Sequence, residues 1–136
     1  MNGHPSLIDT ATATVERVSA ELIEVRFKPD VKLDVEGIGE VVSAKRTLCG
    51  VDSPDVLAVM PPEVDFELNV LNVDHSKANG GCPTRRLAFA GQSALNERLA
   101  NLYFSYFPRH GETRVFNDER EARQWLDQPA EVVPVP

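Results

Sequence analysis

The sequence predicts an α/β protein, with about four helices packed on a mixed sheet of about five strands. Short apolar runs that stop at glycine or proline alternate with longer stretches whose apolar residues recur at helical spacing. Ser, Asp and Asn residues that can cap a helix stand just before those longer stretches. This alternation of strand and helix signals is typical of a sheet layered with helices.

The composition indicates a globular domain and argues against several other classes of protein. With 136 residues, 42% of them apolar and 26% charged, the chain has the length and composition of one globular domain. A net charge of −7, without a stripe of Lys and Arg, argues against binding to nucleic acid or to an anionic membrane surface. No apolar stretch approaches the roughly 20 residues of a membrane span, so we expect no membrane insertion.

The start of the chain and its cysteines indicate a cytoplasmic protein. The first residues lack the basic segment and the apolar run of an export signal. Cys49 and Cys82 are too few for a disulfide scaffold and are not in CxxC spacing, so we expect two reduced thiols.

The folded domain is expected to span residues 14–127. Residues 1–13 are mostly polar and small, show no period, and are expected to form a flexible arm. Residues 128–136 are interrupted by prolines and are expected to form an extended tail.

The domain begins with a predicted β-hairpin. Residues 14–18 and 22–27 are strand-like, and the link between them is short enough for antiparallel pairing. In the second run Ile23, Val25 and Phe27 occupy alternate positions, which places them together on the buried face of the sheet.

A helix, a central strand and an ambiguous segment follow. Asp34 can cap a helix that runs to about residue 49. Residues 56–60 are continuously apolar and stop at two prolines, which predicts a central strand covered on both faces. Residues 65–77 fit either a strand or a helix. We predict a helix there, because it keeps the strand–helix alternation regular.

The last part of the chain repeats strand and helix twice. Two short runs, residues 86–90 and 113–116, are predicted strands. The first stops at a glycine, and Ser93 then caps a helix that ends near residue 107; Asn117 or Asp118 caps a last helix. The expected buried residues are Leu95, Leu99, Leu102 and Tyr106 in the first of these helices, and Ala122, Trp125 and Leu126 in the second.

A family resemblance rests on several runs in this half of the chain. They are Leu87-Ala88-Phe89-Ala90, Leu95-Asn96-Glu97-Arg98, Tyr103-Phe104-Ser105-Tyr106-Phe107, Thr113-Arg114-Val115-Phe116, Glu121-Ala122 and Trp125-Leu126. On these runs and on the order of its elements, the chain resembles the STAS domains, typified by bacterial anti-sigma factor antagonists (the SpoIIAA-like fold). It is most similar to small stand-alone prokaryotic proteins of uncharacterised function. The resemblance covers about residues 14–127 and implies the fold more strongly than any function.

The chain departs from the antagonist pattern at the phosphorylation switch of those proteins. They carry a Ser or Thr just after an Asp, where the helix following the central strand begins. Here Asp65 is followed by Phe66 and Glu67, and residues 57–72 contain no hydroxyl group, so we expect no phosphorylation there. Glu63 and Asp65 are expected to place negative charge at the N-terminus of that helix, either as ordinary capping charges or as a permanent imitation of the phosphorylated state.

No motif in the sequence specifies an enzyme, a cofactor site or a metal site. GxxxxGK, GxGxxG and GxSxG patterns are all absent. Asp74 and His75 form a polar pair to which we assign a surface role or, alternatively, ligand binding or catalysis. Adjacent residues of a helix point about 100° apart, so these two side chains need not meet. We therefore expect a protein that is not an enzyme and holds no cofactor or metal.

Asn96, Arg98, Tyr103 and Phe104 are further candidates for binding a ligand or a partner. Asn96 and Tyr103 are seven residues apart and share a helix face. Four aromatic residues crowd the end of this helix, too many to turn inward together, and Phe104 is expected to point outward. The surplus apolar surface predicts a homodimer or a protein partner, with packing under the last helix as the alternative.

Three functional hypotheses follow, and the one ranked last is an enzyme that uses Asp74 and His75. The first is a non-enzymatic STAS-like interaction or regulatory module that is a cytoplasmic homodimer. The second is a domain that binds a small molecule or a lipid in a pocket between helix and sheet, since SEC14/CRAL-TRIO lipid-transfer proteins have a related core. A deep apolar cavity would favour the second hypothesis, and a flat apolar patch would favour the first.

Overall fold

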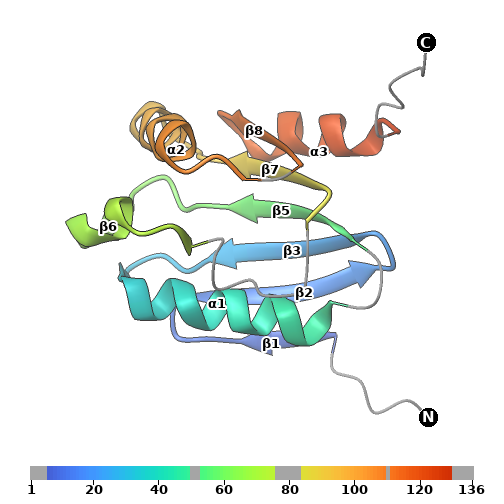
Figure 1. Ribbon diagram of the computed structural model, residues 1–136, viewed down its shortest axis with the longest axis horizontal. Coiled ribbons are helices and arrows are strands. Elements are labelled where there is room, and N and C mark those ends of the chain that lie inside the picture. Colours follow the sequence, from blue (N-terminus) through green and yellow to red (C-terminus); the bar gives the residue numbers. More distant parts are fainter. Residues whose placement is uncertain (1–5, 50–52, 76–83, 110, 130–136) are drawn as a thin grey trace.

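Six strands form one mixed sheet, and three α-helices pack on it within the residues that the structure describes (Figure 1). The computed structural model describes residues 6–49, 53–75, 84–109 and 111–129. In spatial order the strands are β1 (Leu7–Asp9), β2 (Ala13–Ser19), β3 (Leu22–Phe27), β5 (Asp55–Val59), β7 (Arg86–Ala90) and β8 (Glu112–Phe116). The helices are α1 (Val35–Leu48), α2 (Ala94–Tyr106) and α3 (Glu119–Asp127).

Strand direction divides the sheet into two halves. β1, β2 and β3 are antiparallel neighbours, which confirms the predicted hairpin. β3, β5, β7 and β8 run parallel, so crossover connections must join them, and α1 and α2 lie in two of these connections. All five residues of β5 are buried in the middle of the sheet, as predicted. The mixed α/β class is confirmed; within the described residues, the main sheet has one more strand than expected and there is one fewer α-helix.

Each α-helix begins at a capping residue that the sequence predicted. The side-chain oxygens of Asp34, Ser93 and Asp118 each accept a hydrogen bond from the backbone N–H three residues later. A cap of this kind stabilises a helix by about 1 kcal/mol, because it satisfies a donor that has no partner inside the helix. These three side chains therefore determine where the helices begin.

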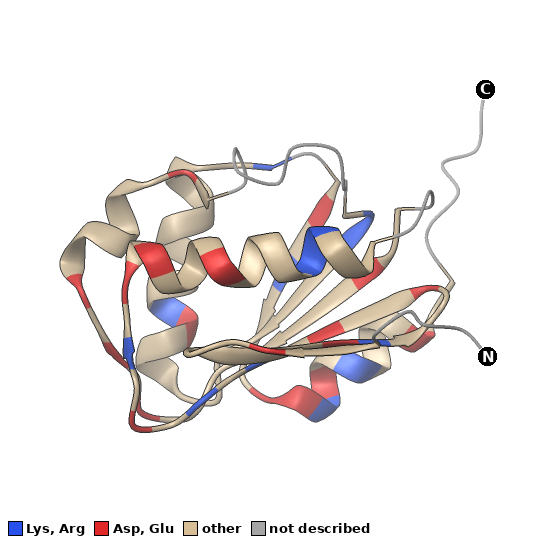
Figure 2. Cartoon of the chain, turned by 90° about the horizontal axis from the view of Figure 1, so that it is seen from below, with Lys and Arg blue, Asp and Glu red and all other residues tan. Residues whose placement is uncertain are grey.

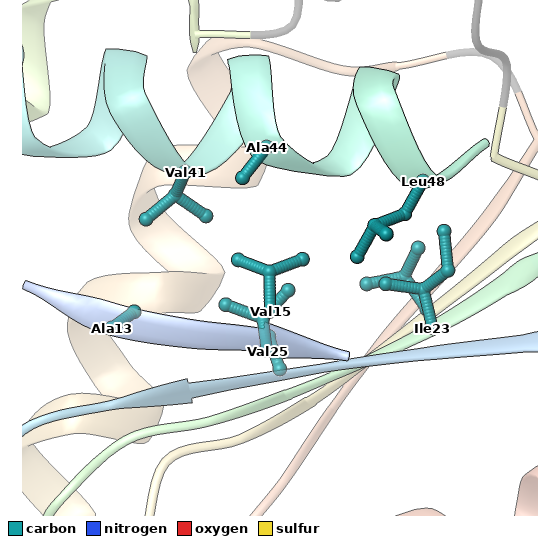
Figure 3. Packing of buried hydrophobic residues seen from close by; sticks show 9 residues of the cluster. Ala13, Val15, Ile23, Val25, Val41, Ala44 and Leu48 are labelled. Carbon is teal, nitrogen blue, oxygen red and sulfur yellow. The ribbon is translucent and has the colours of Figure 1, made fainter. Parts of the chain in front are cut away.

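The two faces of the sheet are covered by different helices. On one face, Val41, Ala44 and Leu48 of α1 pack on buried residues of β2 and β3 (Figure 3). Ile23 and Val25 lie on this face, as their alternation predicted. On the other face, Ala122 of α3 packs against small and branched residues of the central strands, namely Leu57, Val59, Ala88 and Ala90.

The helix predicted for residues 65–77 is wrong over its described part. Asp65–Phe66 form the short strand β6, which pairs in parallel with β4 (Lys32–Leu33). One 3₁₀ turn, η1 (Leu68–Asn72), follows it. Long-range contacts outweigh the weak local helix signal, because the Tyr103 hydroxyl donates to the Val73 carbonyl at 2.7 Å and holds the backbone extended there.

Some residues of the predicted arm and of the predicted tail belong to the folded domain. Leu7–Asp9 of the supposed arm form β1, which adds to the sheet beside β2 through paired backbone groups. At the other end, Gln128 caps α3 through its backbone N–H. Residues 1–5 and 130–136 lie outside the described part of the chain.

The buried face predicted for α2 is also wrong. Leu95 is 63% exposed and Tyr106 is 71% exposed, whereas Asn96 and Ala100 are buried. The aromatic pair Phe89 and Phe104 meets edge to face, with ring centroids 6.2 Å apart, so Phe104 points toward the sheet. The helix is rotated from the predicted orientation, because packing of the large aromatic rings on the sheet outweighs the spacing of the leucines.

The expectation of a free thiol is wrong for Cys49, which is disulfide-bonded. Cys49 follows α1 directly and caps its last turn. Sequence spacing alone gave no sign of this bond, because disulfide formation depends on distance in space. Cys82 lies outside the described residues.

A buried ion pair joins the two central strands to the end of α3. The Arg86 guanidinium donates to the Asp55 carboxylate at 2.7 and 3.3 Å, and both side chains are at least 94% buried. It also donates to the carbonyls of Leu126 and Gln128 at 3.1 and 2.8 Å. Burial alone would raise the pKa of Asp55, but hydrogen bonds and positive charge from Arg85 and Arg86 lower it below its usual 3.8.

We predict that Asp55→Asn lowers the free energy of unfolding by about 3–5 kcal/mol, because it leaves the Arg86 charge buried without its counter-ion. Glu119→Gln is the control, since Glu119 pairs with Arg26 and Arg123 near the solvent. The control should cost about 1 kcal/mol or less. Urea unfolding at pH 7 measures both variants, and equal losses would contradict the assignment.

The pH dependence of the same pair follows from the lowered pKa of Asp55. The stability that the carboxylate contributes is present above its unfolded pKa of 3.8 and is lost as the pH falls through the lower folded pKa. The stability difference between the wild type and Asp55→Asn should therefore shrink only below about pH 4. A difference that already disappears between pH 7 and pH 5 would show that the carboxylate is not held by the two arginines.

Candidate functional site

Within the described residues, the helices cover one face of the sheet only in part. α1 contacts β2 and β3, whereas α2 contacts β8 and reaches β7 through Phe104. α3 lies on the opposite side of the sheet from α1 (Figure 2). Between α1 and α2, residues of β5 and β7 form the floor of an open cavity of about 1110 Å³. The floor residues are Val56, Ala58, Leu87 and Phe89.

The cavity is mainly apolar. Its walls come from α1, from α2 and from the segment that contains β6 and η1. The apolar wall residues are Leu33, Ile38, Val41, Val42, Met60, Val64, Phe66, Val70, Leu71, Leu99, Ala100, Tyr103, Phe104 and Phe107. A large apolar cleft with a few polar groups is the usual form of a small-molecule site, and the volume of this cavity is slightly above the usual range of about 300–1,000 Å³.

Cationic residues line one end of the cavity, at the N-terminal ends of the parallel strands. Lys45 comes from the last turns of α1, where the basic residues of that helix lie (Figure 2). Arg85 precedes β7, and Arg109 lies between α2 and β8. The Arg109 guanidinium donates to the carbonyls of Thr84 at 3.3 Å and Glu112 at 2.8 Å, which fixes its position.

Burial shifts the pKa values of two of these cations. Lys45 is only 8% exposed, and burial first and the nearby Arg109 charge second lower the pKa of its ammonium to about 8. Burial also lowers the pKa of Arg109. Both shifts show that the charged forms are partly removed from water at this end of the cavity.

His75 and Tyr103, which the sequence named separately, come together in the cavity wall. Their rings stack with centroids 5.6 Å apart, and the Tyr103 oxygen accepts the backbone N–H of His75 at 2.9 Å. The His75 ring donates through Nε2 to the Val70 carbonyl at 2.9 Å. Burial raises the pKa of Tyr103, and the charge of Asp74, which also lines the cavity, raises it further. These bonds hold the chain around η1 against α2.

Two further candidates line the cavity in positions that differ from those expected. Asn96 is buried, and its amide donates to the carbonyls of Gly91 at 2.6 Å and Pro61 at 3.0 Å, so it fastens the start of α2 to the sheet. Phe104, expected to point outward, lines the cavity between Phe89 and Tyr103. The sequence placed Phe104 wrongly because it assumed the leucine face to be inward.

The remaining candidates lie outside the cavity. Glu63, Asp65 and Arg98 are exposed and are not part of its lining. Because residues 65–75 do not form an α-helix, Glu63 and Asp65 do not stand at a helix N-terminus, and the argument from the helix dipole does not apply.

Sequence reasoning missed Lys45 and Arg109. Lys45 lies in the last turns of α1 and Arg109 follows the proline after α2, and neither residue belongs to a motif. A weak signal was present, since Lys45 lies four residues after Val41 and therefore on the inward face.

The described part of the chain contains neither a metal-binding cluster nor a membrane-spanning helix. No cluster of three His, Cys, Asp or Glu side chains there is arranged to hold a metal ion. Within the same residues, no helix has both the length and the apolar character needed to cross a membrane.

Comparison with known proteins identifies the fold and the family. No curated protein matches the sequence significantly. Among solved structures, an uncharacterised protein of the DUF3478 family from Shewanella loihica PV-4, described as having a SpoIIAA-like fold, superposes with a TM-score of 0.53. The match is 23% identical in sequence and covers 84% of this chain and 91% of that protein. It therefore confirms the predicted SpoIIAA-like fold. Residues 17–130 match the model of a domain of unknown function, DUF7793, and the chain belongs to that family.

Proposed function

We propose that this protein binds a small apolar or amphipathic molecule in the cavity between α1 and α2. The observation that supports the proposal is the cavity of about 1110 Å³ with a predominantly apolar lining. Of the first two hypotheses drawn from the sequence, an apolar cavity of this volume favours the ligand-binding domain over the interaction module.

Apolar burial supplies the affinity in this proposal. Burying apolar surface contributes about 25 cal/mol per Å², so a ligand that covers much of the lining gains several kcal/mol. The aromatic rings of Phe89, Tyr103, Phe104 and Phe107 line one side and offer flat faces to a ligand. The contacts between Tyr103, Phe104 and Phe107 hold these rings before a ligand arrives, which reduces the entropy cost of binding.

Binding without catalysis is part of the proposal. The polar side chains of the cavity wall are engaged in bonds that position the backbone, as with Asn96, Tyr103 and His75. A nucleophile next to a general base would be needed for covalent catalysis, and the described lining residues do not include such a pair. We therefore assign the cavity a role in carrying or sensing a ligand.

We predict that Leu99→Trp fills the cavity and weakens binding of the neutral apolar fluorophore N-phenyl-1-naphthylamine at least tenfold. Leu99 lines the cavity from α2. Leu95→Trp is the matched control, because Leu95 lies one turn earlier on the same helix and faces solvent. A fluorescence titration measures both affinities. The proposal requires saturable binding to the wild type and to the control. The absence of saturable binding, or equal affinity in both variants, would contradict it.

A second candidate function is the interaction module. It is supported by apolar residues that are exposed on the outer surface of α2. Leu95, Leu102 and Tyr106 are 63%, 47% and 71% exposed and lie along one side of the helix. Exposed apolar residues in a row are typical of a protein contact, and a homodimer would bury two copies at once. The sequence analysis had assigned the partner contact to Phe104. The exposed residues of α2 now take that role in the hypothesis.

For this second candidate, we predict that the wild type has the mass of a dimer in light scattering and that Leu102→Glu is a folded monomer. Leu102 is exposed, so the substitution should leave the fold intact. A wild type that remains monomeric at high concentration would contradict the homodimer.

The cytoplasmic location remains part of the proposed function. The disulfide at Cys49 is a reason to test it, because disulfides are rare in reducing compartments.

A further inference from the structure

We propose that the ligand is an uncharged alcohol or phenol and that its hydroxyl group donates a hydrogen bond to the side-chain oxygen of Asn96. The inference rests on the proposed function, because the ligand occupies the same cavity. It names the chemical class of that ligand and the residue that recognises its polar group.

Asn96 is held in the cavity wall with a fixed orientation of its amide. The residue belongs to the first turn of α2, lines the cavity and is only 8% exposed. Its Nδ2 donates to the carbonyl oxygens of Gly91 at 2.6 Å and Pro61 at 3.0 Å. Carbonyl oxygens can only accept, so the NH₂ group must be the part of the amide that faces them. The Oδ1 atom is thereby fixed as an acceptor on the other side of the amide.

The Oδ1 atom of Asn96 can receive a donor from a ligand. It accepts no hydrogen bond from the described residues, and protein atoms do not enclose it fully. The rest of the side chain is buried and the residue lines the cavity, so the open side of Oδ1 is the cavity side. An acceptor in this position is satisfied by an O–H or N–H donor and not by an anion.

Gly91 lets the first turn of α2 come close enough to the sheet for these bonds. A Cβ at this position would lie 2.9 Å from the backbone nitrogen of Glu97 and 3.2 Å from the Cβ of Asn96. The Gly91 N–H in turn donates to the Phe116 carbonyl at 3.0 Å, which ties this turn to β8. The position of Asn96 is therefore set before a ligand arrives, which reduces the entropy cost of binding.

The charged side chains of the cavity favour an uncharged ligand. Arg85 is paired with Asp55 through bonds of 3.0 and 3.1 Å. Lys45, Asp74 and Arg109 each already interact with another group of the protein. A charged ligand would leave water for a mainly hydrocarbon lining, in which no described residue is an uncommitted counter-ion, at a large cost in free energy.

The floor of the cavity gives the apolar body of the ligand a direction. Asn96 is bonded to the segments that follow the C-terminal ends of β5 and β7. On the cavity side, Ala58 and Val56 of β5 pair with Phe89 and Leu87 of β7 and lead from there toward the N-terminal ends of the strands. The steps between the two ends of β5 extend over about 13 Å, at about 3.3 Å each, which is comparable to an extended decyl chain. The body therefore lies along β5 and β7, with the hydroxyl group at Asn96.

The test compares 1-decanol with 1-methoxydecane, which keeps the oxygen and the decyl chain but lacks the O–H donor. Each compound, and decanoate as the charged analogue, is used to displace N-phenyl-1-naphthylamine from the wild type at pH 7. The methyl group of the ether adds apolar surface, so hydrophobic burial alone would favour the ether. We expect the alcohol to bind at least about fivefold more tightly than the ether, because only the alcohol donates a hydrogen bond to Oδ1. We also expect it to bind more tightly than decanoate.

Asn96→Leu removes the acceptor and should bring the ratio of the alcohol and ether affinities close to one. Asn101→Leu is the matched control, because Asn101 is the same residue type on the exposed side of the same helix and should keep the wild-type ratio. An Asn96→Leu variant that keeps the wild-type ratio, or an Asn101→Leu variant that loses it equally, overturns the inference.

Asn96→Leu also removes the bonds to Gly91 and Pro61, so a measurement on the wild type accompanies it in case the variant fails to fold. The NMR signal of the Asn96 side-chain carbonyl carbon should shift on addition of 1-decanol and shift less on addition of the ether. The same signal of Asn101 should stay in place with both compounds. Equal shifts of the Asn96 signal with the two compounds would show that Oδ1 does not recognise the hydroxyl group.

The outcomes separate the inference from the proposed function. If the ether or decanoate binds to the wild type as tightly as the alcohol, the inference is wrong and the apolar cavity remains supported as a binding site. If none of these compounds binds and the fluorophore does not bind either, the proposed function is wrong as well.

Discussion

The Asp55 carboxylate connects the two faces of the sheet, and the arrangement of the rest of the molecule depends on it. Adjacent residues of an extended chain point to opposite sides, so Arg86 at the start of β7 and Arg85 just before it point to different faces of the sheet. Asp55 binds both. Through Arg86 it holds the end of α3 on one face, and through Arg85 it helps to define the cationic end of the cavity on the other. One buried carboxylate thus links the closed face of the sheet to its open face.

Residue size explains why the two faces differ. On the α3 face, Ala88, Ala90 and Ala122 let the helix approach the central strands closely and leave that side filled. On the other face, α1 and α2 lie toward the two edges, and Tyr103, Phe104 and Phe107 keep α2 at a distance from the strands. Interiors normally pack without voids of this size, and the cavity is therefore the basis of the ligand-binding function proposed above.

Much of the fold could be predicted from local signals, because caps and strand alternation act over a few residues. Asp34, Ser93 and Asp118 marked the helix starts, and the continuous apolar run beginning at Val56 marked the central strand. The rotation of α2 and the structure after Asp65 depend on contacts across the fold, such as those of Tyr103, and no local pattern encodes them. The cavity was foreseen only as an alternative, since empty space has no signature in a sequence. Lys45 of α1 and Arg109 after α2 became candidates only because the fold brings both to the lining of the cavity.

Methyl NMR of the protein during addition of a neutral apolar ligand tests the central claim most directly. Val56 and Ala58 face the cavity, whereas Leu57 and Val59 of the same strand face α3, so one strand contains both the probes and their controls. The account predicts saturable shifts that are largest for the methyl groups of Val56, Ala58 and Leu99 and small for those of Leu57 and Val59. Shifts confined to the exposed Leu95 and Leu102, or shared equally by both faces of β5, would contradict it.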